Sequence, residues 1–224
     1  MTMQNTLRAW CDRAGHGLAA LASAKAGNML VLVAACLAAA VPAAAEGPGK
    51  YAARRFDVAV TVLENGSLDV TETVEFEFQT GTFKKVWRVI PAQRTDGIEI
   101  VHARMDGTPF PRGKGIGQIA LSGRNRIRVE WTFQPTGPSL HTFELRYIAR
   151  GVVYREGDRD IVRWRLLPAE HTYAIATVRG TVTAPVRPVE VRNPEARRAG
   201  VVSQTQEGTT VESTAADVKM NGWV

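Results

Sequence analysis

Hydrophobic and polar residues alternate along the chain past residue 50, which is the pattern of strands with one buried face. The first run has apolar residues at every second position from Phe56 to Val62. Asn65-Gly66 follows and indicates a hairpin turn, because both central residues of the favoured two-residue turn take positive φ angles. A second run, residues 68–78, places its apolar side chains on the even positions. These features predict a β-hairpin.

Further strand-like stretches follow at intervals marked by Gly and Pro, and no stretch past residue 50 has the period of an amphipathic helix. The stretches are Val86–Pro91, Ile98–Arg104, Arg126–Phe133, Thr142–Tyr147, Val152–Tyr154, Ile161–Leu166 and Tyr173–Val186, with weaker signals near Val201 and Thr210. Roughly eight or nine short strands separated by turns predict an all-β fold, namely an antiparallel β-sandwich that is immunoglobulin-like or similar.

Glu72 is an anomaly in the second run, because it stands on the apolar side of the strand. A carboxylate on the core side must be paired, hydrogen-bonded or neutral. The nearest candidate partner is Arg88, which shares its side of the strand with Ile90, and we expect a partly buried ion pair between Glu72 and Arg88. The alternatives are a β-bulge that turns Glu72 to solvent and a catalytic role for its carboxylate.

The first 45 residues have the three parts of a secretory signal. Basic residues come first, an uncharged apolar run extends from Met29 to Val41, and a small-residue ending closes the segment at Ala45. We therefore predict a signal segment with cleavage after Ala45, and export to the periplasm or to the outer face of the cytoplasmic membrane. In two alternatives the segment stays uncleaved as an anchor, or Cys36 is lipidated.

The chain thus divides into three segments. They are a signal peptide or anchor over residues 1–45, an extracytoplasmic β-sandwich domain over residues 46–190, and a polar C-terminal extension with final strands over residues 191–224. Both cysteines, Cys11 and Cys36, fall in the first segment, so the folded part has no disulfide and no thiolate metal site. The formal charge of +6 favours anionic surfaces such as lipid head groups, although the charge is spread along the chain.

Motifs for catalysis are missing from the sequence, which has no Gly-x-Ser-x-Gly, His-Glu-x-x-His or Cys-x-x-Cys. The stretch Gly107–Gly115 resembles a phosphate loop with the wrong spacing, and we expect a flexible hairpin loop. His102, His141 and His171 lie far apart, and we expect structural roles for them, although a three-histidine metal site is left open. We therefore predict no catalytic residues, no cofactor and no metal.

Two short stretches combine cationic and aromatic side chains that could bind lipid head groups or acidic glycans. The candidate binding residues are Lys84, Lys85, Trp87, Arg163 and Arg165. Alternation places Trp164 inward and its two arginine neighbours outward. This arrangement also fits a structural role, in which Trp164 belongs to the core and the two arginines face solvent. We expect an envelope protein or an anionic lipid or glycan surface as partner, and no nucleic acid, because basic and aromatic residues are not clustered.

Three stretches are recognisable together, namely Phe56–Val74, Val86–Pro91 and Tyr147–Trp164. They resemble the N-terminal domain of the bacterial predicted membrane proteins grouped as domain of unknown function 2207, over roughly residues 51–190. The resemblance implies an extracytoplasmic β-rich domain that precedes one or more transmembrane helices. Glu72 and Arg88 fall on positions of the family's pattern, with no assigned role.

The sequence departs from the family's pattern at two points. Residues 85–91 read Lys-Val-Trp-Arg-Val-Ile-Pro where members usually carry Gly-Ile-Tyr-Arg-Asp-Ile-Pro, and the chain ends at Val224 with no transmembrane helix. We therefore expect membrane association only through a C-terminal helix missing from this sequence or through an uncleaved N-terminus.

The function that we expect is that of an exported, non-catalytic binding or scaffolding domain of the bacterial cell envelope. The alternatives are an envelope hydrolase, which would need Glu72, an Asp or a His to converge in one pocket, and a carbohydrate- or lipid-binding module. An exposed Trp87 or Trp131 would favour the module, and buried ones would count against it.

Overall fold

The computed structural model describes residues 49–168, 170–191 and 201–221. These described residues form 13 strands and no helix, so the all-β prediction is confirmed. The signal segment predicted for residues 1–45, the cleavage after Ala45 and the alternative lipidation of Cys36 all lie outside the described residues.

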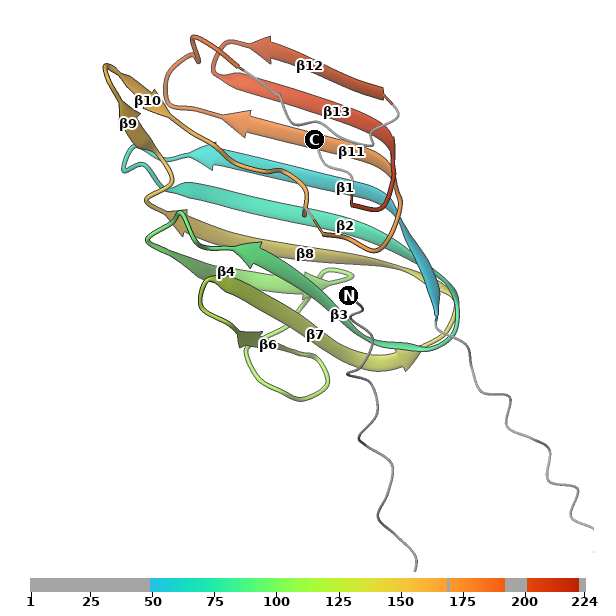
Figure 1. Ribbon diagram of the computed structural model, residues 1–224. Coiled ribbons are helices and arrows are strands. Elements are labelled where there is room, and N and C mark those ends of the chain that lie inside the picture. The colour runs from blue at the N-terminus through green and yellow to red at the C-terminus, as the bar shows by residue number, and fades with distance from the viewer. Residues whose placement is uncertain (1–48, 169, 192–200, 222–224) are drawn as a thin grey trace, which may run out of the picture. The chain divides into compact units, whose positions relative to one another are not determined.

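Eight strands form one large sheet in the order β12-β13-β11-β1-β2-β8-β4-β5 (Figure 1). They are β1 (Lys50–Val62), β2 (Leu68–Thr80), β4 (Gly97–Met105), β5 (Thr108–Pro109), β8 (Ser139–Arg150), β11 (Ile175–Thr183), β12 (Val201–Glu207) and β13 (Thr210–Val218). Burial alternates residue by residue along β2 and β8, as the period-two pattern requires. The weak signals near Val201 and Thr210 correspond to strands that continue this sheet beyond β11.

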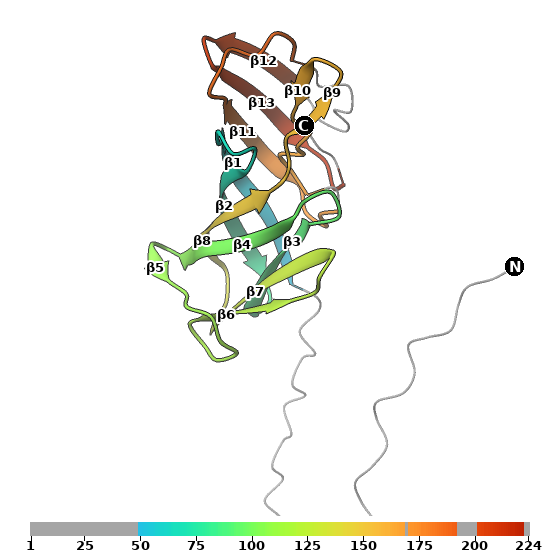
Figure 2. The same cartoon turned by 90° about the vertical axis from the view of Figure 1, so that its left-hand side faces the viewer.

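The remaining strands form a three-stranded sheet and a short hairpin. The sheet has the order β3 (Phe83–Pro91), β7 (Arg126–Thr136), β6 (Gln118–Ser122), and the hairpin pairs β9 (Tyr154–Glu156) with β10 (Arg159–Ile161). In both views, β3, β6 and β7 lie over the part of the large sheet that contains β8 and β4 (Figures 1 and 2). Trp131 of β7 meets Phe143 of β8 edge to face, with ring centroids 5.9 Å apart. The main hydrophobic core therefore lies between these two sheets.

The segment that follows β10 covers the inner face of the large sheet near β11. Leu166 and Leu167 are buried there. A Cβ atom at Gly180 of β11 would lie 2.3 Å from Leu166 Cδ1, so the absence of a side chain at residue 180 allows the close approach. The strand predicted over residues 161–166 is therefore wrong, because β10 ends at Ile161 and the leucines that follow cover a sheet face without joining a sheet edge.

One pairing differs from the antiparallel sandwich that the sequence predicted. β11 runs parallel to β1, with Ala53 beside Ile175 and Thr61 beside Thr183. The covering segment carries the chain back to the end of the sheet where β1 begins, so β11 starts from the same end and the sheet is mixed. The 13 strands exceed the number predicted, because alternation did not identify β6 or the very short β5 and β10. The strand predicted over Val152–Tyr154 overlaps β9 only at Tyr154.

The Asn65-Gly66 turn joins β1 to β2 as predicted, but its geometry differs from the two-residue turn. Gly66 has a φ of 77°, whereas Asn65 does not have a positive φ. Asn65 Oδ1 instead accepts a hydrogen bond from Ser67 N at 3.0 Å, and Leu63 N donates to Ser67 O at 2.8 Å. The side chain of Asn65 thus supports a longer loop, as Asn does in Asx-turns.

Candidate functional site

Glu72 on β2 faces the interior, and the structure joins it to Arg88 on β3. Arg88 Nε donates to Glu72 Oε2 at 2.6 Å, and Arg88 Nη2 donates to Glu72 Oε1 at 2.8 Å. The hydroxyl of Tyr147 on β8 also donates to Glu72 Oε1 at 2.8 Å. Glu72 is only 3% exposed and pairs regularly with Val58 of β1, so no bulge turns it to solvent. The ion pair expected from the sequence is present.

The electrostatics of this cluster keep its hydrogen-bond donors protonated. Burial by itself would lower the pKa of Arg88, but the adjacent Glu72 carboxylate more than offsets burial and raises that pKa above its ordinary value. Burial, and then the charge of Glu72, raises the pKa of Tyr147 well above 10.0. Burial likewise raises the pKa of the neighbouring Tyr173. The cluster therefore links β2, β3 and β8 inside the core through stable charge-assisted hydrogen bonds.

The side chains that alternate with Arg88 on β3 point outward. Trp87 is 54% exposed, and the guanidinium carbon of Arg128 lies 4.5 Å from its ring centroid, within the range of a cation–π interaction. Lys85 Nζ and Arg128 Nη2 contact Glu130 at 2.6 and 2.7 Å, and their hydrogen bonds lower the pKa of Glu130. We call the surface formed by Lys85, Trp87, Arg128 and Glu130 the β3–β7 face.

Lys84 and Trp131 complete the description of this sheet. Lys84 is exposed, at the irregularity where the pairing of β3 with β7 shifts between Phe83 and Lys85. Trp131 is 2% exposed and belongs to the core. The two tryptophans that bear on a binding module therefore differ, because Trp87 is open to solvent and Trp131 is not.

Arg163 and Arg165 lie on a different element, the segment that follows β10. Arg163 Cζ lies 5.8 Å from the ring centroid of Tyr154, and Arg165 is exposed. Trp164 between them is half-buried, with its ring centroid 6.4 Å from that of Tyr147. The predicted inward and outward directions are observed, although the segment is not a strand. The structure thus brings Lys84, Lys85 and Trp87 together on β3 and places these arginines elsewhere.

Positive charge is concentrated around the three-stranded sheet. Residues 83–94 and 108–136, which contain β3, β5, β6 and β7, carry nine Lys and Arg and a single acid, Glu130. We call these two stretches the basic layer. The nine cations are Lys84, Lys85, Arg88, Arg94, Arg112, Lys114, Arg124, Arg126 and Arg128. The rest of the chain from Glu46 carries 16 Lys and Arg against 20 Asp and Glu. The net charge of the whole chain does not indicate this segregation of charge. The scarcity of acidic residues in the two stretches is the sequence signal that could have identified it.

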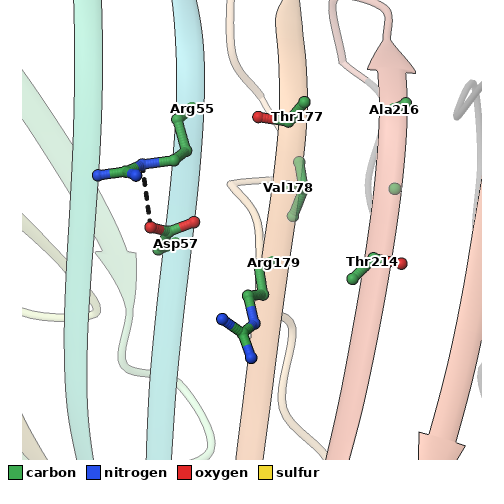
Figure 3. Close-up of a pocket in the computed structure, with 8 residues that line it drawn as sticks. Arg55, Asp57, Thr177, Val178, Arg179, Thr214 and Ala216 are labelled. Atoms are coloured by element: carbon green, nitrogen blue, oxygen red, sulfur yellow. Dashed lines mark ion pairs between the residues drawn. The ribbon is translucent and has the colours of Figure 1, made fainter.

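A shallow hollow of about 410 Å³ lies on the outer face of the large sheet, over β1, β11 and β13 (Figure 3). Its charged groups already have partners. Arg55 Nε lies 3.1 Å from Asp57 Oδ2, and Arg179 Nη2 lies 2.8 Å from Glu212 Oε2. The sequence pattern did not single out these residues. Because their charges are paired with one another and the hollow is shallow, we regard it as polar surface and not as a binding site.

The three histidines of the folded part are held by different partners. His102 Nε2 lies 2.8 Å from Glu144 Oε1, His141 Nδ1 lies 2.7 Å from Asp106 Oδ2, and His171 Nδ1 lies 2.7 Å from the carbonyl oxygen of Tyr173. In the described ranges, no group of three His, Cys, Asp or Glu side chains is placed to hold a metal ion.

Comparison with known families assigns the chain to a class of predicted membrane proteins. The chain belongs to the family described as predicted membrane protein (DUF2207) N-terminal domain, whose family model matches residues 52–224. The resemblance drawn from the sequence is therefore confirmed, and the match includes β12 and β13. Across the part of the chain that the structure describes, no helix has both the length and the apolar character to cross a membrane.

No curated protein matches the chain. Among solved structures, the chain is similar to the M1 zinc metallopeptidase of Deinococcus radiodurans, with 15% identity, a TM-score of 0.41, and coverage of 74% of this chain and 39% of that one. It is also similar to yeast LTA4 hydrolase, with 9% identity, a TM-score of 0.46, and coverage of 75% and 29%. The chain thus spans well under half the length of these enzymes, and similarity at this level carries no information about activity.

Proposed function

We propose that the chain is an exported, non-catalytic binding domain of the bacterial cell envelope and forms the extracytoplasmic part of a membrane-associated protein. Membership of a family of predicted membrane proteins supports the association with a membrane. The secretory signal pattern in residues 1–45 supports export to the periplasm or the outer face of the cytoplasmic membrane. The proposed scaffold is a β-sandwich in which the three-stranded sheet covers part of the large sheet.

The contrast between the two faces of β3 is the observation that carries the binding function. On the inner face, Arg88 is fixed by two hydrogen bonds to Glu72. On the outer face, Trp87 is 54% exposed beside Lys85 and Arg128. Exposed tryptophan and arginine on a rigid element are typical of recognition surfaces, because they bury a large area on binding at a small loss of conformational freedom. The surrounding excess of cations favours an anionic partner.

The exposure of Trp87 also favours the second candidate function, a carbohydrate- or lipid-binding module. The burial of Trp131 counts against such a module, because this tryptophan is not available on the surface. Glu72, one of the residues that a hydrolase could have used, is enclosed in the core by Arg88 and Tyr147. The structure thus favours binding through the β3–β7 face over chemistry at Glu72.

Export is tested with alkaline phosphatase, which is active only outside the cytoplasm, fused to the C-terminus of the full chain. The matched control is the same fusion without residues 1–45. We expect phosphatase activity from the full chain and loss of activity from the control. An inactive but stable full-length fusion would contradict the proposed compartment.

Binding is tested in living cells with a photo-crosslinking amino acid placed at residue 87. The matched control carries it at residue 101, because Val101 is 46% exposed but lies on β4 of the large sheet. We expect an envelope component to be captured from residue 87 and not from residue 101, and the capture to weaken when Lys85 and Arg128 are changed to Gln. Equal capture from both positions would count against the β3–β7 face.

A further inference from the structure

The loop that leads from β5 into β6 carries an exposed apolar side chain next to cations. Ile116 is 56% exposed, and Arg112 and Lys114 precede it at alternate positions, both exposed. Neither the core nor the β3–β7 face uses these three side chains. An apolar tip flanked by cations is the pattern of segments that enter the head-group region of a bilayer.

Backbone hydrogen bonds hold this glycine-rich loop in one shape. Gly113 N donates to Ile119 O at 2.8 Å, Ile119 N donates to Pro111 O at 2.9 Å, and Gly117 N donates to Thr132 O at 2.8 Å. The loop that the sequence predicted to be flexible is therefore tied to β6 and β7. A loop that is already ordered loses little conformational entropy when it seats on another surface.

The loop lies at the end of the domain where the chain also enters and leaves it. β6 begins at Gln118 beside Thr132 of β7, which pairs with Lys85 near the start of β3. β1 begins at Lys50, which pairs with the last residue of β2 shortly before β3 begins. β13 ends at Val218, beside the first residue of β11. A membrane segment joined at either point would hold this end, and the loop with it, toward the bilayer.

We propose that this end of the domain rests on a bilayer containing anionic phospholipid, with Ile116 entering the boundary of the acyl chains and Arg112 and Lys114 contacting lipid phosphates. This proposal rests on the proposed function, because it names the partner of the same basic layer. Arg88 is paired with Glu72 in the core, and the other eight cations of the layer, with its single acid Glu130, match an anionic surface. Trp87 suits the membrane interface, where tryptophan is enriched. A glycan would use the cations but would gain little from Ile116, and an apolar side chain flanked by cations favours lipid as the partner.

The electrostatic part is tested with the full chain recovered from the exported fraction and vesicles of phosphatidylcholine, with and without phosphatidylglycerol. We expect binding only to the anionic vesicles, and weakening by salt. The double variant Arg112→Gln/Lys114→Gln should bind roughly 30-fold more weakly, since each cation near such a surface contributes about fivefold. The matched control Arg155→Gln/Arg159→Gln removes the same charge from the exposed β9–β10 hairpin, which stands away from β6 in both views (Figures 1 and 2).

The insertion part is tested with Ile116→Trp and lipids brominated on the acyl chain, which quench tryptophan fluorescence on contact. The matched control is Val189→Trp, because Val189 is 99% exposed outside the layer. The five tryptophans of the chain, among them Trp87, give a background of quenching that is measured on the unaltered chain. We expect quenching above this background from the tryptophan at residue 116 and none above it from the tryptophan at residue 189. Ile116→Ser should weaken binding about 5- to 10-fold. All variants carry the same N-terminus, so its contribution cancels in each comparison.

Three results would overturn the proposal. They are equal binding to neutral and anionic vesicles, equal weakening by both double variants, and binding to soluble polyphosphate with no quenching at residue 116, which would identify a polyanion as the partner. Unchanged melting temperatures verify that the variants fold. The phosphatase fusion reports the compartment independently, so failure of lipid binding is distinguishable from failure of export.

Discussion

Tyr147 and Arg88 donate hydrogen bonds to the same atom, Oε1 of Glu72, each at 2.8 Å, although they belong to different sheets. Tyr147 lies on β8 of the large sheet, and Arg88 lies on β3 of the three-stranded sheet. The carboxylate of Glu72 therefore joins the two sheets through hydrogen bonds, within a core that is otherwise held together by apolar packing. Because a buried charge without its partner is costly, this cluster fixes the register in which β3 lies on the large sheet.

Arg88→Met should lower the free energy of unfolding by roughly 3–5 kcal/mol, because it leaves the Glu72 carboxylate buried without its cation. Denaturant unfolding of the full chain measures the change. The control Arg179→Met breaks an exposed pair with Glu212 and should have a much smaller effect, because solvent screens exposed pairs. The double variant Glu72→Leu/Arg88→Met should recover much of the loss. Arg88→Met unfolding within about 1 kcal/mol of the unaltered chain would contradict this account.

Tyr147→Phe should lower the free energy of unfolding by about 1–3 kcal/mol, because Glu72 Oε1 loses a buried donor that water cannot replace. Tyr154→Phe is the matched control, since Tyr154 is 40% exposed and its hydroxyl loses only solvent contacts. Thermal and denaturant unfolding of the two variants give the comparison. Equal stabilities would mean that the Tyr147 hydroxyl does not support the ion pair.

Gly180→Ala should destabilise the domain by about 1–3 kcal/mol, because the new methyl group would overlap Leu166 Cδ1. Gly137→Ala is the control, because a Cβ atom there meets nothing within 4 Å. Combining Gly180→Ala with Leu166→Ala should cost less than the sum of the two single changes, since the smaller side chain removes the overlap. Strict additivity would show that the covering segment does not pack on residue 180.

Stability should fall in acid partly through Glu130. Hydrogen bonds from Lys85 and Arg128 hold the pKa of Glu130 below its ordinary value of 4.5, so the folded state binds a proton less readily than the unfolded state. The stabilisation is therefore complete above the unfolded pKa and is lost as the pH falls through the folded pKa. Glu130→Gln should flatten the decline of stability below about pH 4.5. An NMR titration that places the Glu130 carboxyl at its ordinary pKa would refute the expectation.

The alternation of residues was enough to predict the strands of the hairpin from β1 to β2, the inward direction of Glu72 and its pairing with Arg88. Each of these features depends on which side of a strand a residue occupies, and a period of two records that directly. The parallel partnership of β1 and β11 was not predictable in this way, because Ala53 and Ile175 meet only after the chain has crossed the sheet. The sequence analysis did not identify the basic layer for a related reason. β3 and the loop before β6 are separate in the sequence, and they come close only because β7 lies between β3 and β6 in the three-stranded sheet.

The position of β1 between β2 and β11 has a consequence for the order in which the domain can assemble. β2 follows β1 almost at once along the chain, but β11 is among the last strands to be synthesised. Until it arrives, the other edge of β1 exposes unpaired N–H and C=O groups to any chain that can add a strand. Contacts between such distant parts of the sequence slow folding. A product truncated before residue 175 would therefore keep a long open edge and tend to aggregate.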